Sequence, residues 1–451
     1  MPEISFQLNG QATTVSYEEG MHFLEVLRES CGITSVKDGC APQGVCGCCT
    51  VLLDGKPSLS CQLDPASAHG SEVVTLEGLP ERQRQLLAGA FVREGAVQCG
   101  FCTPGIAVRA AHLINRDLTG DRSRVERGLA GHLCRCTGYH RIVDAIQTAG
   151  EAWNEGSSAC DGPPRRHHFF GEDYGRERSS EAPRNDGIGA SSGRYRGHDQ
   201  TLGTKNFVAD MTEEGMLHGA LVLSDHPRAT VLRIDTSTAS RSPGVERIFT
   251  AEHVPGVCNH GLLIPDWPLF VAQGESTRYI GDVLALVVAD SQHHARMAAE
   301  SVEVEYEVLE PVTTTQAALA TDAPAIHPGG NLLEVCAFSR GNVDAALSDA
   351  AFVVDETFST QRIEHAFLEP EASLASPTGD GGLKIYSQGQ GVHDDQLQIA
   401  AILGIDRHRI DVELVSNGGA FGGKEDLSVQ GHVALAAWLL QRPVRVVLTR
   451  E

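Results

Sequence analysis
No apolar run in the 451-residue sequence reaches the about 18 residues that a membrane-spanning helix requires, so we expect no membrane span. Basic residues are also scarce, with 36 Lys and Arg against 59 Asp and Glu and a formal net charge of −23. This imbalance argues against a nucleic-acid partner or an anionic membrane surface, since either requires a basic patch. Residues 1–10 lack the basic flank and apolar core of a secretory signal, and we therefore expect a cytoplasmic protein.

Cysteine, by contrast, is abundant. Ten of the 13 cysteines lie in the first 136 residues, at C-x2-C and C-x-C spacings too close for ordinary disulfides. The total is odd, and no export signal precedes it. In a reducing compartment such clustering indicates metal binding.

The first 80 residues follow the order of a small β-grasp domain. Residues 4–8 alternate apolar and polar, Asn9-Gly10 is typical of a hairpin turn, and 12–15 return as a second strand. Residues 21–29 have helical periodicity, and the strand at 50–53 enters a turn at Asp54-Gly55. We predict a ferredoxin-like domain over residues 1–80.

The remaining chain divides by its periodicity. Residues 81–154 predict a helical bundle, and 155–195, rich in Gly, Ser and Pro, predict an extended linker. Residues 196–451 are mixed α/β, so the fold class is multidomain α+β. In this last part we expect strands at 218–223, 283–288, 302–306, 352–357 and 444–448. We expect helices at 292–300 and 396–403.

The first cysteine motif is Cys40-Ala-Pro-Gln-Gly-Val-Cys46-Gly-Cys48-Cys49, followed twelve positions later by Cys61. A 2Fe–2S cluster needs four thiolates, and a tight glycine-containing loop can supply three of them. The pattern is similar to the plant-type C-x4-C-x2-C arrangement, except that the first gap is five residues. Spacing alone leaves Cys48 as an alternative to Cys49, and a zinc ribbon would require a second C-x2-C pair. We assign the ligands to Cys40, Cys46, Cys49 and Cys61.

The second motif combines Cys99-Gly-Phe-Cys102 with Cys134-Arg-Cys136. We expect each pair at the start of a helix, where backbone amides favour negatively charged sulfur. Pro104 suits the first turn of such a helix. The predicted second cluster therefore has Cys99, Cys102, Cys134 and Cys136 as ligands.

Together, the two motifs resemble the xanthine oxidase family of molybdenum hydroxylases, over residues 1 to about 155. The resemblance implies that Gln98 and Cys136 lie against a molybdopterin. It further implies that the cluster in the helical domain is nearer to molybdenum and that the β-grasp cluster is farther away.

A second signature is the segment Gly418-Gly-Ala-Phe-Gly-Gly-Lys-Glu425. Alone, such a loop is weak evidence, because a tight turn or a phosphate cradle would look the same. After two iron–sulfur motifs it resembles the molybdenum loop of the same family. The cofactor contacts implied by this resemblance are Gly419, Ala420, Phe421 and Gly422.

The same resemblance implies individual roles. The Gly422 amide would meet a molybdenum oxygen ligand, Phe421 would form a pocket wall, and Gln390 would hydrogen-bond the apical oxo group, with Gln388 as a competitor. Glu425 would orient the substrate, although it could also be a surface carboxylate following a lysine. A segment containing Glu364, His365, Phe367 and Glu369 resembles one beneath the pocket and could be structural.

The resemblance also implies the remaining domains and partners. Residues 196–311 would form an α/β hammerhead-like domain, and 312–451 the N-terminal part of a molybdopterin-binding domain. The family's flavin domain would lie at the linker, so FAD is expected on a separate subunit. The rest of the molybdenum region, with its base glutamate, is expected on a partner chain, a truncated chain being the alternative. The molybdopterin could be in a dinucleotide form.

The implied activity is hydroxylation with water as the oxygen source, and the electrons would leave through both clusters to a flavin partner. Because Glu425 could accept a hydrogen bond from a ring N–H, a nitrogen heterocycle is favoured: xanthine or hypoxanthine first, then nicotinate. An aldehyde dehydrogenase of the same family is a further alternative. Rival interpretations are a non-catalytic electron-transfer subunit and a scaffold for cofactor insertion.

Overall fold

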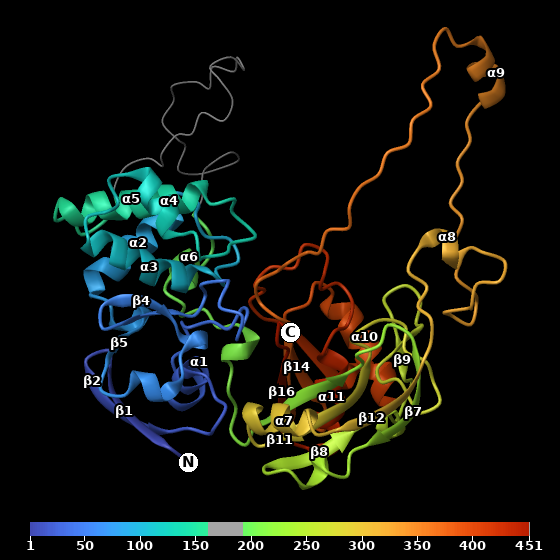
Figure 1. Cartoon of the computed structure of the whole chain (residues 1–451), viewed down its shortest axis with the longest axis horizontal. Helices are drawn as coiled ribbons and strands as arrows, with labels where there is room; N and C mark the ends of the chain where they lie inside the picture. The colour runs from blue at the N-terminus through green and yellow to red at the C-terminus, as the bar shows by residue number, and fades with distance from the viewer. Residues whose placement is uncertain (161–192, 451) are drawn as a thin grey trace.

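The computed structural model describes residues 1–160 and 193–450, which form two lobes and an arm that leaves the second lobe (Figure 1). Most of the predicted linker, 155–195, lies outside the described residues. Across the two described ranges, no helix combines the length and apolarity needed to cross a bilayer.

A five-stranded sheet in the order β2-β1-β5-β3-β4 forms the base of the first lobe. Asn9 (φ 53°) and Gly10 (φ 81°) adopt the left-handed backbone that the predicted hairpin turn requires. Helix α1 (Phe23–Glu25) continues into a π-helical turn (Val26–Ser30), and its apolar side chains are buried in the core of this domain. The strands are β1 (Glu3–Leu8), β2 (Gln11–Ser16), β3 (Thr50–Leu53), β4 (Lys56–Leu59) and β5 (Glu72–Val74).

The helical bundle completes this lobe, as predicted. Its members are α2 (Glu81–Arg93), α3 (Thr103–Asn115), α4 (Arg122–Gly128) and α5 (His140–Asn154), and the short α6 (Gly197–Thr201) packs against α2 and α3. Helix α3 also docks on the β-grasp domain. A Cβ atom on Gly105 would lie 2.4 Å from the carbonyl oxygen of Gly47, so only glycine permits this approach.

A seven-stranded mixed sheet organises the second lobe, in the order β15-β14-β13-β16-β6-β11-β8. Strand β16 pairs in parallel with β6, so one sheet draws strands from both sides of the predicted boundary at residue 311. Its strands are β6 (Leu217–Leu223), β8 (Val245–Phe249), β11 (Val283–Ala289), β13 (Ala372–Pro377), β14 (Leu383–Ser387), β15 (Ile410–Leu414) and β16 (Val444–Val447).

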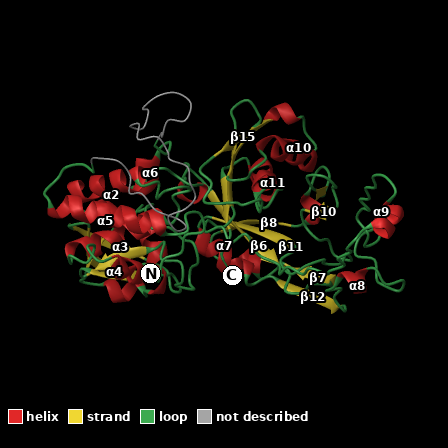
Figure 2. Ribbon diagram, turned by 90° about the horizontal axis from the view of Figure 1, so that it is seen from above, coloured by secondary structure: helices red, strands yellow, loops and turns green. Residues whose placement is uncertain are grey.

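Helices cover this sheet, and two small ribbons flank it (Figure 2). Helix α7 (Gln292–Ala299) packs on β6 and β11, α10 (Val392–Leu403) on β15, and α11 (Gln430–Leu440) on β13. The ribbons pair β7 (Ala229–Asp235) with β12 (Glu303–Val308), and β9 (Asn259–His260) with β10 (Trp267–Pro268). The expected helices at 292–300 and 396–403 are confirmed, as are all the expected strands of this lobe but one.

The exception is the strand predicted at 352–357, which was wrong. These residues lie in the arm, which contains only α8 (Thr315–Ala318) and α9 (Val343–Asp349) and projects from the second lobe (Figure 1). Phe352 and Val354 are 91% and 83% exposed. A strand requires a neighbouring strand for its backbone hydrogen bonds, and no described strand pairs with this segment.

Buried ion pairs join the two lobes. Asp210 accepts from Arg28 at 2.9 Å and from Lys37 at 2.5 Å, and all three side chains are nearly fully buried. Arg450 donates to the carbonyl oxygens of Phe367 (2.8 Å) and Leu368 (2.9 Å) in the second lobe and of Gly39 (3.2 Å) in the first. These contacts fix the cysteine loops relative to the glycine-rich loop.

Candidate metal centres and cofactor site
The first four predicted ligands form a buried cage in the β-grasp domain. The backbone amides of Val45 and Cys46 donate to the Cys40 sulfur at 3.4 and 3.3 Å, which favours a charged thiolate. The thiols associate in two pairs, Cys40 with Cys46 and Cys49 with Cys61. Two pairs of thiolates suit a cluster in which two irons share four protein ligands.

Cys48 occupies a different position. It is buried, its amide donates to the Cys46 sulfur at 3.5 Å, and the helical-domain thiol Cys102 is among its electrostatic neighbours. It packs in the core shared with the helical domain, together with Cys40 and Cys46, whereas Cys49 and Cys61 pack within the β-grasp core. Cys49 as the ligand and Cys48 as a packed thiol stay a prediction.

The second cage lies at the base of the helical bundle. The sulfurs of Cys99 and Cys136 are 3.5 Å apart, and Cys102 pairs with Cys134. Cys102 directly precedes α3, as expected. Cys134 and Cys136 were predicted at a helix start, but α5 begins only at His140, and both instead lie in the preceding loop.

The Tyr139 side chain stabilises the loop that contains Cys134 and Cys136. Its hydroxyl accepts from the Cys134 amide at 3.0 Å and donates to the His132 carbonyl oxygen at 3.1 Å. Tyr139 has a φ of 71°, a conformation that costs energy in a non-glycine residue and requires support from its surroundings. Tyr139 therefore stabilises the loop that carries the predicted ligands Cys134 and Cys136.

The buried thiols need a cationic partner to carry charge. Hydrogen bonds from neighbouring thiols, together with burial, raise the pKa of Cys40, Cys61 and Cys136. Each of the two groups brings four thiols together in two pairs. Four thiolates shared by two irons are the protein ligands of a 2Fe–2S cluster, so the residues present fit such a cluster.

The glycine-rich loop connects β15 to α11. Gln390 is bonded to this loop: its side-chain oxygen accepts from the amides of Gly422 (3.1 Å) and Lys424 (3.4 Å). Gln388 lies beneath the loop, where it donates to the Pro370 carbonyl oxygen at 2.8 Å and accepts from the Lys424 ammonium. Of the two glutamines, Gln390 is therefore the better candidate for the cofactor contact.

A cavity of about 290 Å³ separates this loop from the second cage. Gln98 and Cys136 line it from the first lobe, and the Gln98 side-chain amide donates to the Cys136 carbonyl oxygen at 3.0 Å. Residues from four distant parts of the sequence meet here: Gln98, Cys99, Cys136, Arg194, Asn417, Gly419 and Phe421. The structure thus brings together four residues expected to contact molybdopterin, while Ala420 is buried behind them and Gly422 is exposed beside them.

Two residues of this cavity were not predicted. Arg194 donates to the Gln98 carbonyl oxygen at 3.2 Å, and Asn417 donates to the Gln388 carbonyl oxygen at 2.5 Å. Asn417 could have been found because it directly precedes the glycine run. Arg194 ends a low-complexity stretch, where nothing in the sequence marks it.

His365 and Glu425 lie on the same side of Gly422. A Cβ atom on Gly422 would be 3.9 Å from a Glu425 carboxylate oxygen and 4.0 Å from His365 Nε2. Arg135, next to the second cage, donates to the His365 carbonyl oxygen at 3.0 Å and to that of Glu364 at 3.3 Å. The helical domain therefore holds the 364–365 segment against the loop.

A buried ion pair supports the loop from below. The Lys424 ammonium lies 3.6 Å from a Glu369 carboxylate oxygen and 4.4 Å from the centre of the Phe367 ring. Burial raises the pKa of Glu369 to about 7 and lowers the pKa of Lys424. The Glu369 carboxyl group can therefore change protonation near neutral pH.

Comparison with known protein families agrees with this arrangement. Residues 75–147 match the 2Fe-2S binding domain, residues 202–310 the a/b hammerhead domain of aldehyde oxidase and xanthine dehydrogenase, and residues 326–451 the molybdopterin cofactor-binding domain.

Individual relatives extend the comparison. An aldehyde oxidoreductase from Megalodesulfovibrio gigas is 33% identical over 438 residues, which cover 94% of this chain and 46% of the relative. The small FeS subunit of a nicotinate dehydrogenase from Eubacterium barkeri is 40% identical over 149 residues, covering 33% of this chain and 94% of that subunit. The solved aldehyde oxidoreductase of Desulfovibrio desulfuricans superimposes with a TM-score of 0.87 at 29% identity, over 99% of this chain and 50% of the other.

The chain spans about half the length of the aldehyde oxidoreductases that it matches. The match nevertheless includes both cysteine motifs, the hammerhead region and the glycine-rich loop. On these grounds the chain belongs to the xanthine oxidase family of molybdenum hydroxylases.

Proposed function
We propose that this chain carries two 2Fe–2S clusters and part of the molybdopterin site of a molybdenum hydroxylase. The observation that carries the proposal is the cavity in which Gln98, Cys99 and Cys136 face Gly419 and Phe421. A cofactor in this cavity would touch a thiol cage on one side and the glycine-rich loop on the other. Bound there, molybdenum–molybdopterin, in mononucleotide or dinucleotide form, would supply two-electron oxidation with water as the oxygen source.

The chain's own residues would bind the cofactor and orient the substrate. The exposed Gln390 side chain, whose oxygen accepts from the Gly422 amide, would offer its NH₂ group to the cofactor, and Phe421, 49% exposed, would present its ring to a substrate. The positive φ of Phe421 (56°) is the kind of strained backbone that functional loops retain. Together these groups would form one wall of an active site.

The order of the two cages suits electron transfer away from the cavity. Cys99 and Cys136 border the cavity, whereas the β-grasp cage lies on the other side of the domain contact. The Leu133 amide, adjacent to Cys134, donates to the Cys46 carbonyl oxygen at 2.9 Å and thereby connects the two cysteine loops. A flavoprotein subunit is the proposed acceptor beyond the β-grasp cage.

For the substrate we propose a nitrogen heterocycle, with a purine such as xanthine or hypoxanthine first and nicotinate second. Glu425 is exposed beside Gly422 and could accept a hydrogen bond from a ring N–H, which an aldehyde lacks. The similarity to aldehyde oxidoreductases keeps an aldehyde as a further candidate, after nicotinate. Glu425→Gln in the assembled enzyme should lower turnover of xanthine far more than turnover of benzaldehyde, and equal losses would reject the purine assignment.

For the partner we propose a polypeptide that carries the remaining molybdopterin-binding region and the base glutamate. The arm, residues 315–363, leaves the second lobe with its large hydrophobic side chains in solvent (Figure 1). Exposed apolar groups on this scale mark an interaction surface. They are Leu319, Leu332, Leu333, Val335, Phe338, Val343, Leu347, Phe352, Val353, Val354, Phe358 and Ile363.

The proposal is tested by metal retention. We expect four irons on the chain alone, and molybdenum only when the chain is purified together with its partner. Molybdenum held by the partner alone would favour the rival function, a non-catalytic electron-transfer subunit. The intact loop from Gly418 to Glu425 argues against that rival, because a docking module would not need it.

A further inference from the structure

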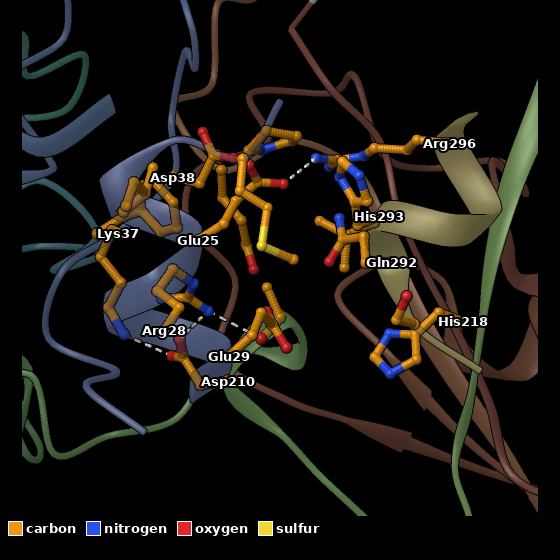
Figure 3. Close-up of a pocket in the computed structure, with 18 residues that line it drawn as sticks. Glu25, Arg28, Glu29, Lys37, Asp38, Asp210, His218, Gln292, His293 and Arg296 are labelled. Carbon is orange, nitrogen blue, oxygen red and sulfur yellow. Dashed lines mark hydrogen bonds and ion pairs between the residues drawn. The ribbon is translucent and has the colours of Figure 1, made fainter. Parts of the chain in front are cut away.

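A second cavity lies at the junction of the two lobes (Figure 3). Its volume is about 80 Å³, enough for several water molecules. Charged side chains of both lobes line it, among them Arg28, Glu29, Lys37, Asp38 and Asp210. Water in this cavity would find hydrogen-bond partners among these ionised groups.

Glu369 lies at the inner end of this cavity. Only 1% of the residue is exposed, and it lines the cavity together with Pro370. One carboxylate oxygen, Oε2, accepts from the Gly418 amide at 2.5 Å and faces the Lys424 ammonium at 3.6 Å. The other, Oε1, is buried and has no partner among the described residues. Such an oxygen is costly unless a water or a proton satisfies it.

Glu369 stands between the second cage and the glycine-rich loop. Phe101, which separates Cys99 from Cys102 in the sequence, lines the same cavity, and the Cys99 thiol interacts electrostatically with Glu369. On its other side, a Cβ atom on Gly418 would lie 2.2 Å from the Glu369 Cβ, so the loop can reach Glu369 only with glycine there. An additional negative charge on the second cage would therefore raise the pKa of the Glu369 carboxyl group.

The other charges around Glu369 are already engaged. Lys424 from the loop is its closest cation, and Lys37 from the first lobe is bound to Asp210 at 2.5 Å. The negative charge of Asp210 raises the pKa of Glu369, whereas the positive charges of Lys424 and Lys37 lower it. The charges of Glu371 and Arg450 shift the pKa of Lys424 in opposite directions. None of these cations is free to offset an additional electron on the neighbouring thiolates, whereas a proton on Glu369 would.

We propose that Glu369 and the hydrated cavity form a proton-loading site coupled to reduction of the cluster held by Cys99, Cys102, Cys134 and Cys136. When one electron enters this cluster from the molybdenum centre, one proton passes from solvent through the cavity waters to the Glu369 carboxylate and forms an O–H bond at Oε1. Reoxidation by the second cluster releases the electron, and the proton returns to solvent. This inference rests on the proposed function, because it requires that the cysteines hold iron.

Reduction of the cluster and protonation of Glu369 favour each other. The reduced cluster favours protonated Glu369, so the reduction potential of this cluster falls as pH rises. For one electron and one proton the slope reaches at most about 59 mV per tenfold change in proton concentration. Because burial brings the pKa of Glu369 to about 7, the slope lies within an accessible range of pH.

The test is an EPR-monitored redox titration of the full chain, with dithionite as reductant, from about pH 6 to pH 9. The nearer cluster should show the falling potential in the wild-type chain, and Glu369→Gln should remove the slope. Asp395→Asn is the matched control. Asp395 is also buried with one unpartnered oxygen, and burial raises its pKa to about 6, but its charged neighbours are Asp394 and Asp426 rather than a thiol. This variant should keep the slope.

A pH-independent potential in the wild-type chain would overturn the inference, as would a Glu369→Gln variant with an unchanged slope. If Glu369→Gln does not fold, infrared difference spectra of the wild-type chain decide: reduction should produce a protonated-carboxyl band, and its absence contradicts the inference. An iron-free chain would instead contradict the proposed function, so the two failures are distinguishable.

Discussion
The side-chain amide of Gln98 donates to the carbonyl oxygen of Cys136 at 3.0 Å. This bond joins the two loops that carry the second cysteine motif, at the point where both face the glycine-rich loop across a cavity. The predicted metal ligands and the predicted cofactor loop thus line one shared cavity.

Replacement of Gln98 by alanine should weaken cofactor retention without loss of iron. The variant loses one hydrogen bond, about 1 kcal/mol, and one wall of the cavity, but no thiol ligand. Molybdenum and iron analysis of the chain purified with its partner checks this. Gln85→Ala on α2, whose side chain bonds only the exposed Glu81, should retain both metals.

Cys48 and Cys49 should differ in iron content when each is replaced by alanine. The Cys49 thiol pairs with Cys61 inside the first cage, so Cys49→Ala should lose that cluster and half of the iron. Cys48→Ala should keep four irons per chain. Iron analysis with EPR of the reduced chain distinguishes the two variants, and the opposite pattern would transfer the ligand role to Cys48.

Gly105→Ala should destabilise the contact between the two iron–sulfur domains. The added methyl group would meet the Gly47 carbonyl oxygen, a backbone atom that cannot move cheaply, and we expect a loss of about 1–3 kcal/mol. Gly89 in α2 has no atom within 4 Å of its Cβ position, and Gly89→Ala should stabilise by about 0.5–1 kcal/mol. Thermal unfolding of both variants measures the difference, and equal effects would show that the close approach of α3 is unimportant.

Acid should destabilise the second lobe through His432. Burial lowers the pKa of His432 to about 4, whereas an unfolded histidine titrates near pH 6.5. The native protein is therefore at full stability above about pH 6.5 and loses roughly 3 kcal/mol from this residue as pH falls to about 4. His432→Gln can retain the donor to the Leu269 carbonyl oxygen. Denaturant unfolding at pH 7 and pH 4.5 should show a smaller acid loss in this variant, and an unchanged loss would exclude His432 as the cause.

Local signals predicted much of the fold. Asn9-Gly10 and Asp54-Gly55 both form hairpin turns with positive φ, because these residue types tolerate that backbone. The cysteine spacing placed four thiols in each of two cages, since close spacing in the chain enforces closeness in space. The glycine run likewise indicated a loop whose backbone other groups approach closely, as Glu369 approaches Gly418.

Long-range relationships could not be predicted in this way. The β-branched and aromatic residues at 352–357 are typical of a strand, but a strand depends on a partner that the sequence does not identify. The pairing of β16 with β6 joins residues more than 200 positions apart, and no local pattern encodes it. Glu369 looked like part of a structural segment, because its orphan oxygen and its cavity arise only when both lobes meet.

The central claim is that eight thiolates hold two separate 2Fe–2S clusters. Iron quantification with EPR of the anaerobically purified, dithionite-reduced chain tests it most directly. We predict four irons per chain and two distinguishable 2Fe–2S signals. A colourless, iron-free protein, or one that binds zinc at these cysteines, would contradict the account.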